Sequence, residues 1–473
     1  MIPITEYAGR DVAVYGLGRT GLSAAKALAA GGARVHAWDD GDAARLDAEA
    51  EGVNVSDINK RDWQKFAALV LSPGIPYRFP QPHRLVRMAE MMGVPVVGDM
   101  ELFARAVQAL PEKGRPKIVG ITGTNGKSTT TALIGHILKE AGRDVRVGGN
   151  IGRGVLDMAP LNANAIYVLE LSSYQLDLVE SLRCDVAVFL NISPDHLDRH
   201  GGMDGYVAAK KRIFANQRLR DVAVVGIDDP HSQAIAMGRQ RPGGARVVQI
   251  SAEFGLARGV SAVDGHLYDS TGGQAIRVGN LTDAEALPGQ HNYQNAAAAY
   301  ATCHALGIAP GRIMSAIRTF PGLPHRMERV GEIEGVRFIN DSKATNAQAA
   351  EQALKTWPKV HWIVGGIAKA EGIEPLSPWF DHVARAYLIG ESEPTFAKTL
   401  RGKVDFDRCG TIEAATQAAF DAAKASGESD PIVLLSPACA SFDQFKDFEA
   451  RGDAFRDLVK RLGAQTAPQR EAV

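Results

Sequence analysis

Residues Thr122–Thr129, with the sequence Thr-Gly-Thr-Asn-Gly-Lys-Ser-Thr, have the composition of a loop that binds phosphate. The two glycines let backbone amides face phosphate oxygens, Lys127 can neutralise their charge, and Ser128 can ligate Mg²⁺. The loop is a shortened variant, because Ile121 stands where the standard G-x-x-x-x-G-K-[ST] pattern has its first glycine. The pattern predicts an ATP-binding loop, and the alternative is a glycine-rich turn with a solvated lysine.

Acid and imidazole groups that could hold a metal follow this loop. Glu170 ends an apolar run, and Asp195 and His196 stand together in Asn-Ile-Ser-Pro-Asp-His. His196 and His200 have a spacing found in zinc sites, but they lack the glutamate of H-E-x-x-H and no thiolate lies nearby. Hard oxygen ligands beside a triphosphate favour Mg²⁺. Taken alone, Glu170 is also compatible with a surface carboxylate, and Lys210-Lys211-Arg212 with a solvated basic face.

A second glycine-rich loop, Gly16-Leu-Gly-Arg-Thr-Gly21, follows a strand-like run and opens a helix-like segment. Asp39 and Asp40 follow about 20 residues later, which completes the fingerprint of a dinucleotide-binding turn. A helix N-terminus of this kind holds any diphosphate, with the acidic residue on a ribose or a nearby hydroxyl. A nicotinamide cofactor and a nucleotide-sugar therefore fit equally well, and a purely structural turn is the third alternative.

The elements that position these loops alternate along the chain. Short runs rich in Val and Ile alternate with Ala-rich helical segments that often stop at Gly, which is typical of parallel sheets with crossover helices. The predicted strands are Asp11–Tyr15, Ala33–Trp38, Lys117–Thr122, Val336–Asn340, Val360–Val364, Ala386–Ile389 and Pro431–Leu435, with helices over Ser23–Ala30 and Lys127–Glu140. The pattern restarts three times and predicts three consecutive α/β domains: N-terminal Rossmann-like, central P-loop ATPase-like and C-terminal Rossmann-like. Connectors near Gly98 and at Pro321–Pro324 place the predicted boundaries at residues 1–98, 99–322 and 323–473.

Composition restricts the class of protein. The length of 473 residues suggests about three domains, and 45% hydrophobic with 23% charged residues is ordinary globular usage. Lys and Arg total 53 against 54 Asp and Glu, so no global field favours nucleic acid or an anionic membrane. The four cysteines are scattered, and neither a signal peptide nor a stretch of membrane-spanning length is present. We expect a cytoplasmic protein, with a frayed tail after Leu462.

Several motifs together resemble the Mur ligase family. Gly123–Ser128, Glu170–Ser173, His291–Asn295 and His325-Arg326 stand in the order and spacing of that family. Gly16–Gly21, Ser72–Gly74, Asn340–Asn346 and Ser436–Phe448 are similar to the branch that adds D-glutamate to UDP-N-acetylmuramoyl-L-alanine. The resemblance covers nearly the whole chain, and the D-N-P-R motif typical of the branch that adds a diamino acid is absent from the sequence.

The resemblance implies an ATP-dependent carbon–nitrogen ligase of peptidoglycan precursor synthesis, and hence of cell wall biogenesis, cell shape and cell division. The N-terminal domain would hold the UDP of the substrate, the central domain ATP, and the C-terminal domain D-glutamate. The substrate carboxylate would attack the γ-phosphate to give an acyl phosphate and ADP, and the amine would then expel phosphate. Both steps gather negative charge, so Lys127, Arg326 and two Mg²⁺ ions are the implied stabilisers. Because implied ATP contacts stand on both sides of Pro321–Pro324, we expect domain closure, and we expect a monomer.

The resemblance also implies residue roles. The implied UDP-substrate contacts are Leu17, Arg19, Thr20, Asp39, Asp40, Ser72, Gly74, Asn150, Ser172 and Gln175. The implied ATP contacts are Gly123, Thr124, Asn125, Gly126, Lys127, Ser128, Thr129, Asn292, Asn295, Arg326 and Asp341. The implied D-glutamate contacts are Lys343, Thr345, Lys369, Ser441 and Phe448, the implied metal ligands are Ser128, Glu170, His196 and a carbamylated Lys210, and the implied catalytic residues are Lys127, Glu170, His196, Lys210 and Arg326.

One departure from the family pattern and three rival functions remain. Family members often read Gly-Gly-Asp-Gly-Lys where this chain has Gly365-Gly-Ile-Ala-Lys369, which bears on the shape of the amino-acid pocket. Another Mur-type amino-acid ligase is the rival within the family. An NAD-dependent oxidoreductase would use Gly16–Gly21 but gives the loop at Lys127 no role, and a nucleotide-gated binding protein needs no Asp341-Ser-Lys343 cluster.

Overall fold

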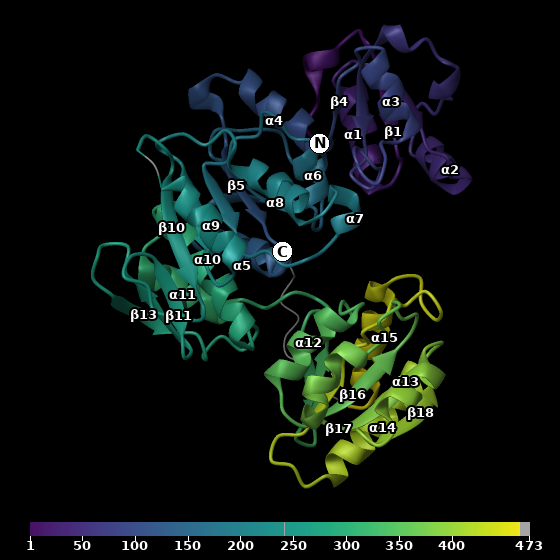
Figure 1. Ribbon diagram of the computed structural model, residues 1–473, viewed down its shortest axis with the longest axis vertical. Helices are drawn as coiled ribbons and strands as arrows, with labels where there is room; N and C mark the ends of the chain where they lie inside the picture. Colours follow the sequence, from purple (N-terminus) through teal and green to yellow (C-terminus); the bar gives the residue numbers. More distant parts are fainter. Residues whose placement is uncertain (241, 464–473) are drawn as a thin grey trace. The chain divides into compact units, whose positions relative to one another are not determined.

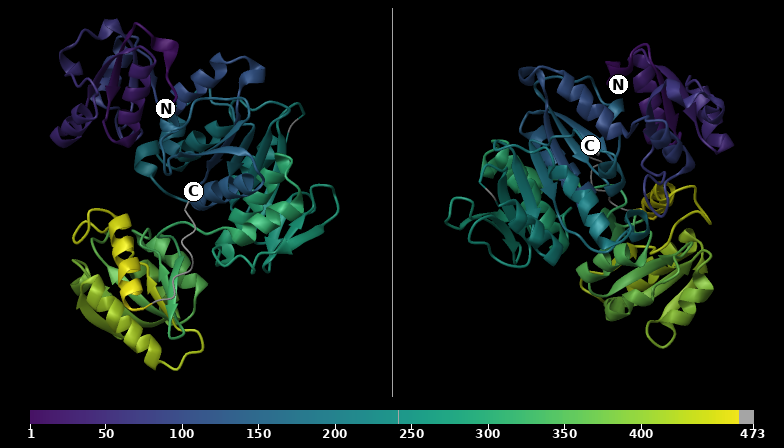
Figure 2. Two further views of the ribbon diagram at one scale, coloured as in Figure 1. Left: turned by 180° about the vertical axis from the view of Figure 1, so that it is seen from behind. Right: turned by 45° about the horizontal axis from the view of Figure 1, so that its top comes forward.

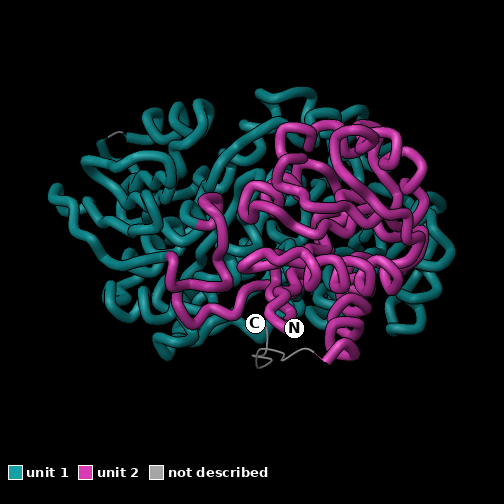
Figure 3. The backbone as a smooth tube through the Cα atoms, turned by 90° about the horizontal axis from the view of Figure 1, so that it is seen from below, with its two compact units in different colours: residues 1–281, 293–317 teal, residues 282–292, 318–473 magenta. Residues whose placement is uncertain are grey.

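The computed structural model describes residues 1–240 and 242–463. Within them the chain forms two compact units, residues 1–281 with 293–317, and residues 282–292 with the chain from 318 onward (Figure 3). The first unit contains a four-stranded and a nine-stranded sheet, and the second contains a six-stranded sheet. All three sheets are built mainly from parallel strands with helices between them, so the predicted α/β class is confirmed.

The first sheet, in which Figure 1 labels β1 and β4, has the order β2-β1-β3-β4, and all its strand pairs are parallel. Its elements are β1 (Asp11–Tyr15), α1 (Arg19–Ala30), β2 (Arg34–Trp38), α2 (Asp42–Ala50), β3 (Phe66–Leu71), α3 (Arg84–Met91) and β4 (Val96–Val97). After Asp11, strand β1 is apolar because alternate side chains enter two different cores, Val12 and Val14 on the α1 face and Ala13 and Tyr15 on the α3 face.

The nine-stranded sheet has the order β13-β12-β11-β10-β9-β8-β5-β7-β6. Its strands are β5 (Lys117–Thr122), β6 (Asp144–Gly149), β7 (Ala165–Glu170), β8 (Val186–Phe189), β9 (Val222–Gly226), β10 (Arg246–Ser251), β11 (Val260–Val263), β12 (His266–Asp269) and β13 (Ile276–Asn280). Its helices are α4 (Asp99–Ala109), α5 (Lys127–Glu140), α6 (Ser173–Asp177), α7 (Leu197–His200), α8 (Met203–Lys211), α9 (Pro230–Arg239), α10 (Gln290–Ala305) and α11 (Pro310–Thr319). Strand β5 lies between β7 and β8, where the order of the sheet reverses, which is the position at which parallel α/β sheets bind ligands.

The sheet of the second unit has the order β14-β15-β19-β16-β17-β18. Its elements are β14 (Glu328–Ile333), β15 (Val336–Asn340), α12 (Ala347–Thr356), β16 (Val360–Gly365), β17 (Val383–Ile389), α13 (Glu393–Leu400), β18 (Phe406–Gly410), α14 (Ile412–Ala425), β19 (Ile432–Leu435) and α15 (Phe448–Arg461). Helices α12 and α13 pack in the core on one face, and α14 and α15 pack in the core on the other, a layering that Figure 2 shows from two further sides.

The structure corrects the predicted elements in three respects. Helix α1 begins at Arg19, directly after the glycine-rich loop, and not at Ser23. The large sheet ends in an antiparallel meander, β11-β12-β13, whose first turn places Asp264 and Gly265 at positive φ. Strand β14 pairs antiparallel with β15. The parallel pattern expected from the sequence missed these strands because hairpins need neither a crossover helix nor a long apolar run.

Within residues 1–240 and 242–463, no helix combines the length and the apolar character needed to cross a membrane. Apart from its first residue, the predicted tail after Leu462 lies outside the described residues.

Candidate active site

The phosphate loop of the central sheet joins the end of β5 to the start of α5. Gly123 and Gly126 have φ values of 153° and 79°, a region that favours glycine. A Cβ atom on Gly126 would lie 2.1 Å from the side-chain oxygen of Asn295, which also accepts a hydrogen bond from the Thr130 hydroxyl at 3.1 Å. The loop therefore depends on glycine for its shape and lies against α10.

Side chains of the loop are held by their neighbours. The Lys127 ammonium donates to the Thr124 carbonyl at 2.7 Å, and the Thr124 hydroxyl lies 3.1 Å from that of Tyr206. The backbone N–H of Asn125 donates to the side-chain oxygen of Asn191 at 2.9 Å. Ser128 and Thr129 are buried in the first turn of α5. The N-terminus of α5 offers backbone N–H groups and the positive end of its dipole, an arrangement that suits phosphate.

Lys210 lies under this loop and is only 1% exposed. Its ammonium nitrogen donates to the Gly123 carbonyl at 2.8 Å and lies 3.5 Å from the Thr122 hydroxyl. Burial, with a smaller contribution from Lys127, holds the pKa of Lys210 well below its ordinary value. The next residue, Lys211, is exposed. The structure thus contradicts the interpretation of Lys210 as part of a solvated basic face.

Glu170 ends β7 and is 3% exposed, so it is not a surface carboxylate. One carboxylate oxygen accepts a hydrogen bond from the Asn150 side chain at 2.8 Å, and the other is buried with no hydrogen-bond partner among the described residues. A buried carboxylate oxygen without a partner is costly unless a cation or donor satisfies it. Glu170 therefore fits a metal ligand.

His196, a predicted metal ligand, lies just before a helix and not within it. It precedes α7 with a φ of 51°, its ring centre lies 5.0 Å from that of Tyr174, and burial lowers its pKa, which favours the neutral imidazole that metals bind. His200 ends α7, is buried, and contacts the Ser173 hydroxyl at 3.0 Å. The two histidines therefore do not share a helix face as the zinc alternative requires. The described residues contain no group of three or more His, Cys, Asp or Glu arranged to hold a metal ion.

The glycine-rich loop of the first sheet is closed by its own neighbours. Gly16 has a φ of 89°, and a Cβ atom on Gly21 would lie 1.8 Å from the Gly16 carbonyl oxygen. The Ser72 hydroxyl donates to the same carbonyl at 2.7 Å. One Asp39 oxygen accepts the Leu17 N–H at 2.7 Å, and the other accepts the Gly41 N–H at 2.8 Å. Asp39 thus holds the shape of the loop, while Thr20 is half-buried and Asp40 is exposed.

Two predicted UDP-substrate residues, Arg19 and Asn150, are linked to Glu170 by hydrogen bonds. The Arg19 guanidinium donates to the carbonyls of Asn150 at 3.2 Å and Gly152 at 3.0 Å, and Asn150 bonds Glu170. Arg199, the third residue of α7, donates to the carbonyl of Gly74, another predicted UDP-substrate residue, at 3.0 Å. Ser172 and Gln175 form a capping box at the start of α6, and the Gln175 amide lies 3.4 Å from the carboxylate of the buried Asp99.

In the second unit, the backbone around Arg326 is strained. His325 and Met327 have φ values of 59° and 46°, which residues other than glycine rarely adopt. The Met327 N–H donates to Asp341 at 3.2 Å, and the Ser436 hydroxyl donates to the other Asp341 oxygen at 2.8 Å. Burial raises the pKa of Asp341 to about 7. The Arg326 Nε is buried without a hydrogen-bond partner among the described residues. In the same unit, the Asn292 amide donates to the Pro288 carbonyl.

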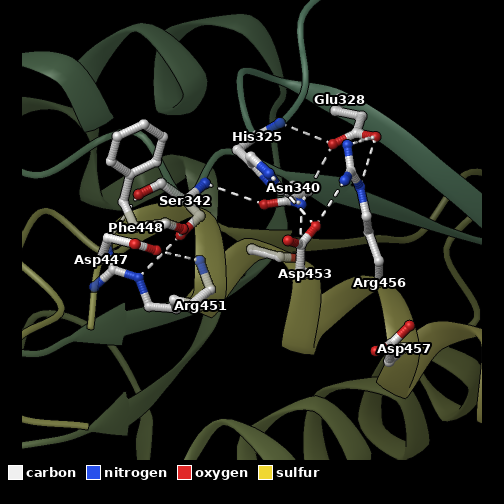
Figure 4. A network of polar contacts seen from close by, with 12 residues as sticks. His325, Glu328, Asn340, Ser342, Asp447, Phe448, Arg451, Asp453, Arg456 and Asp457 are labelled. Carbon is white, nitrogen blue, oxygen red and sulfur yellow. Dashed lines mark hydrogen bonds and ion pairs between the residues drawn. The ribbon is translucent and has the colours of Figure 1, made fainter. Parts of the chain in front are cut away.

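The residues predicted to contact D-glutamate all belong to the second unit, with Phe448 at the start of α15 (Figure 4). The Lys343 ammonium lies 5.5 Å from the ring centre of Phe448, and the Thr345 N–H donates to the Lys343 carbonyl. Ile367 pairs with Ala440 through two backbone hydrogen bonds, so the divergent Gly365–Lys369 loop is held next to Ser441, with Lys369 exposed.

Residues that the sequence did not single out contact predicted site residues or their neighbours within the same unit. They are Asp99, Asn191, Arg199, Tyr206 and Arg451. No spacing pattern marks them, because each acts through a long-range contact. The only sequence signal that could have identified Arg199 and Arg451 is their position three residues after His196 and Phe448, respectively.

Comparisons with known proteins agree on one family. Residues 121–303 match the Mur ligase middle domain, and residues 325–439 match the Mur ligase glutamate ligase domain. The chain is 56% identical to the UDP-N-acetylmuramoylalanine–D-glutamate ligase of Caulobacter sp. (strain K31), covering 99% of both chains. It is 57% identical to the protein of the same name from Phenylobacterium zucineum (strain HLK1), covering 98% of both.

A solved structure shows the same fold. The UDP-N-acetylmuramate–alanine ligase of Thermotoga maritima aligns with a TM-score of 0.59 and 16% sequence identity, covering 96% of this chain and 99% of that one. At this identity the likeness concerns the fold alone.

Proposed function

The chain belongs to the Mur ligase family, and from this premise we propose that it joins D-glutamate to UDP-N-acetylmuramoyl-L-alanine at the expense of ATP. The single observation that carries the proposal is the meeting of two phosphate-type loops near one carboxylate. Glu170 lies at the end of β7 beside β5, which leads into the Lys127 loop, and Asn150 connects Glu170 to Arg19 of the Gly16–Gly21 loop. An oxidoreductase gives the Lys127 loop no role, and a binding protein needs no such convergence.

The proposed chemistry activates a carboxylate, because oxide is too poor a leaving group for direct attack by an amine. An oxygen of the L-alanyl carboxylate attacks the γ-phosphorus of ATP, the bond to ADP breaks, and an acyl phosphate forms. The amine nitrogen of D-glutamate then attacks the acyl carbon, a proton is lost from nitrogen, and phosphate leaves. Lys127 and the N–H groups at the start of α5 would stabilise the charge that gathers on the phosphoryl oxygens.

The local environments of the remaining predicted ATP contacts support their proposed roles. Asn295 supports the loop from α10, and Asn292 lies in the first turn of the same helix. Arg326 would supply further positive charge, which its unpaired buried Nε supports, and Asp341 would bind the nucleotide.

We propose that Ser128, Glu170, His196 and Lys210 hold Mg²⁺, with Lys210 carbamylated. The unpaired Glu170 oxygen, the neutral imidazole of His196 and the lowered pKa of Lys210 support this assignment. Bound there, Mg²⁺ would offset the negative charge of the phosphates. Carbamylation joins the neutral lysine nitrogen to CO₂ with loss of one proton, so a cation that would repel metal becomes an anion that can bind it.

The division into domains of residues 1–98, 99–322 and 323–473 is also proposed. It is supported by the strands of the three sheets, since β1–β4 fall in the first range, β5–β13 in the second and β14–β19 in the third. We place the reaction in the cytoplasm, where ATP and UDP-linked precursors are available. We further propose a monomer, because one chain carries the residues assigned to all three ligands.

The test is a phosphate-release assay with ATP, Mg²⁺ and UDP-N-acetylmuramoyl-L-alanine against a panel of D- and L-amino acids. We expect release only with D-glutamate, and none from Lys127→Ala. Release with a different amino acid would assign another ligase activity of the family. Absence of release with every amino acid, together with the absorbance of a bound nicotinamide, would favour the oxidoreductase.

A further inference from the structure

Arg451, the fourth residue of α15, is a buried cation that the proposed chemistry does not use. It is 1% exposed. Its Nε donates to the Ser342 hydroxyl at 3.0 Å, and one Nη donates to the Ser342 carbonyl at 2.8 Å and to the Cys439 carbonyl at 3.0 Å. Figure 4 shows the side chain extending from α15 towards Ser342.

The acceptors of Arg451 are all neutral oxygens. Among the described residues it forms no ion pair within 4.0 Å, and its second Nη has no hydrogen-bond partner. Burial lowers its pKa to about 10, so the guanidinium is still protonated at neutral pH. Burying a charge without an anionic partner costs free energy, and such groups are poor evidence for stability. The contacts that Arg451 makes therefore point to a role beyond the stability of the fold.

Those contacts join two segments that carry predicted D-glutamate residues to α15, which begins with Phe448. Ser342 precedes Lys343, and Cys439 lies two residues before Ser441. The Ser342 hydroxyl in turn donates to the Phe448 carbonyl at 2.8 Å.

The fourth segment is the loop that diverges from the family pattern. The unpaired Nη lies 3.3 Å from the position that a Cβ atom on Gly366 would occupy. Gly366 has a φ of 128° and opens the loop that ends at Lys369. One guanidinium thus lies where all four segments meet.

We propose that Arg451 is the positioning residue of the amino-acid pocket, and this inference rests on the proposed function. It fixes the four segments relative to one another, so that Lys343, Ser441, Phe448 and Lys369 face the same ligand. It acts through these residues and not by contact with D-glutamate. Its charge, added to that of Lys343, favours an amino acid with two carboxylates over a neutral one.

A second cation on α15 offers a comparison with Arg451. Arg456, also on α15, donates to Glu328 at 2.7 Å, and Glu328 accepts the His325 N–H at 2.8 Å (Figure 4). These contacts hold the segment of Arg326, and they reach the Ser342 segment through the His325 carbonyl, which accepts the Lys343 N–H at 3.0 Å. Arg456 makes no hydrogen bond to Cys439 or Gly366 among the described residues, whereas Arg451 approaches both. Loss of Arg451 should therefore disturb the amino-acid pocket while the contacts of Arg456 remain.

The experiment measures steady-state phosphate release while D-glutamate, ATP or the UDP-substrate is varied in turn. D-glutamate-dependent release by the wild type must be present first, so failure of the proposed function is seen separately. We expect Arg451→Met to raise the KM for D-glutamate at least about tenfold, with the other two KM values within about twofold. Arg451→Lys should recover part of this loss, because an ammonium group can still reach the carbonyl acceptors.

Two further variants keep the inference testable. Lys460→Gln, at an exposed site near the end of α15, should match the wild type. Ser342→Ala removes the hydroxyl between Arg451 and Phe448, so it should also raise the KM for D-glutamate selectively, and it decides the matter if Arg451→Met does not fold. Equal changes in all three KM values, an unchanged KM for D-glutamate, or no recovery with lysine would overturn the proposal.

Discussion

Lys210 occupies a position where an ammonium ion is unfavourable. It is buried under the phosphate loop, and its pKa is lowered by burial and by Lys127. A lysine with an unperturbed pKa of about 10.4 is almost entirely charged at neutral pH and cannot capture CO₂, whereas a neutral amine can. We expect Lys210→Ala to be nearly inactive and to recover partly when acetate supplies the missing carboxylate. The measurement is phosphate release with and without acetate.

The neighbouring lysine is the matched control. Lys211 is exposed and lies outside the phosphate loop's contacts, so Lys211→Ala should keep normal turnover without acetate. Mass spectrometry of the intact wild type under CO₂, followed by acidification, would report the carbamate directly. The assignment of the carbamate to Lys210 would be wrong if Lys210→Ala kept normal turnover. It would also be wrong if Lys211→Ala were the inactive variant that acetate rescues.

Asp341 should make stability depend on pH. Its pKa is raised by burial from 3.8 to about 7, so the folded state binds this proton more tightly than the unfolded state between those values. Its contribution to stability is fully present below the unfolded pKa and is lost as pH rises towards the folded pKa. Asp341→Asn keeps an acceptor for the Met327 N–H but cannot ionise. Relative to the wild type, the variant should gain about 2–3 kcal/mol of unfolding free energy between roughly pH 5 and pH 8.

Urea unfolding followed by tryptophan fluorescence at both pH values measures this difference, and comparing the two proteins cancels the titration of other groups. A difference between variant and wild type that is the same at both pH values would show that Asp341 ionises normally.

At the scale of elements, the sequence predicted β1, β5, α5 and β15 with the bounds that the structure has. Each is marked by its own residues, an apolar run for the strands and a glycine on either side for α5. The antiparallel strands β11–β14 carry no such signal, because their pairing depends on the turns between them. The site was predictable where a loop carries its chemistry in adjacent residues, as at Lys127. It was not predictable for Arg199 or Arg451, whose contacts join segments more than a hundred residues apart.

The turn between β1 and α1 gives a prediction for one element. A Cβ atom on Gly21 would lie 1.8 Å from the Gly16 carbonyl oxygen, whereas one on Gly18 would meet no atom within 4 Å. Gly18 also has an ordinary φ of −64°. We expect Gly21→Ala to open the turn, lose about 1–3 kcal/mol of stability and bind the UDP-substrate at least roughly tenfold more weakly.

Gly18→Ala is the matched control, and it should keep the melting temperature of the wild type. Thermal unfolding and isothermal titration with the UDP-substrate test both variants. If the two melt alike, the close approach of Gly21 to Gly16 does not determine the turn.

For the whole molecule, the central question is whether two nucleotide sites lie in two separate domains of the chain. The Gly16–Gly21 loop belongs to the four-stranded sheet, and the Lys127 loop belongs to the nine-stranded sheet. Asp39 determines the shape of the first loop through the Leu17 and Gly41 amides, and it makes no hydrogen bond to the second in the described residues. Lys127 bonds within its own loop. Each side chain can therefore be removed with little direct effect on the other site.

We predict that substitutions at these two positions affect different ligands. Lys127→Ala should abolish phosphate release, because the charge on the γ-phosphoryl oxygens loses its cation, while the affinity for UDP-N-acetylmuramoyl-L-alanine stays within about twofold of the wild type. Asp39→Ala should weaken binding of the UDP-substrate by roughly tenfold or more, because the Leu17 amide loses its acceptor, with the affinity for ATP unchanged. Isothermal titration with each ligand measures the four affinities. If Asp39→Ala alters ATP binding, or if Lys127→Ala weakens both ligands alike, the assignment of the two nucleotides to two separate domains is wrong.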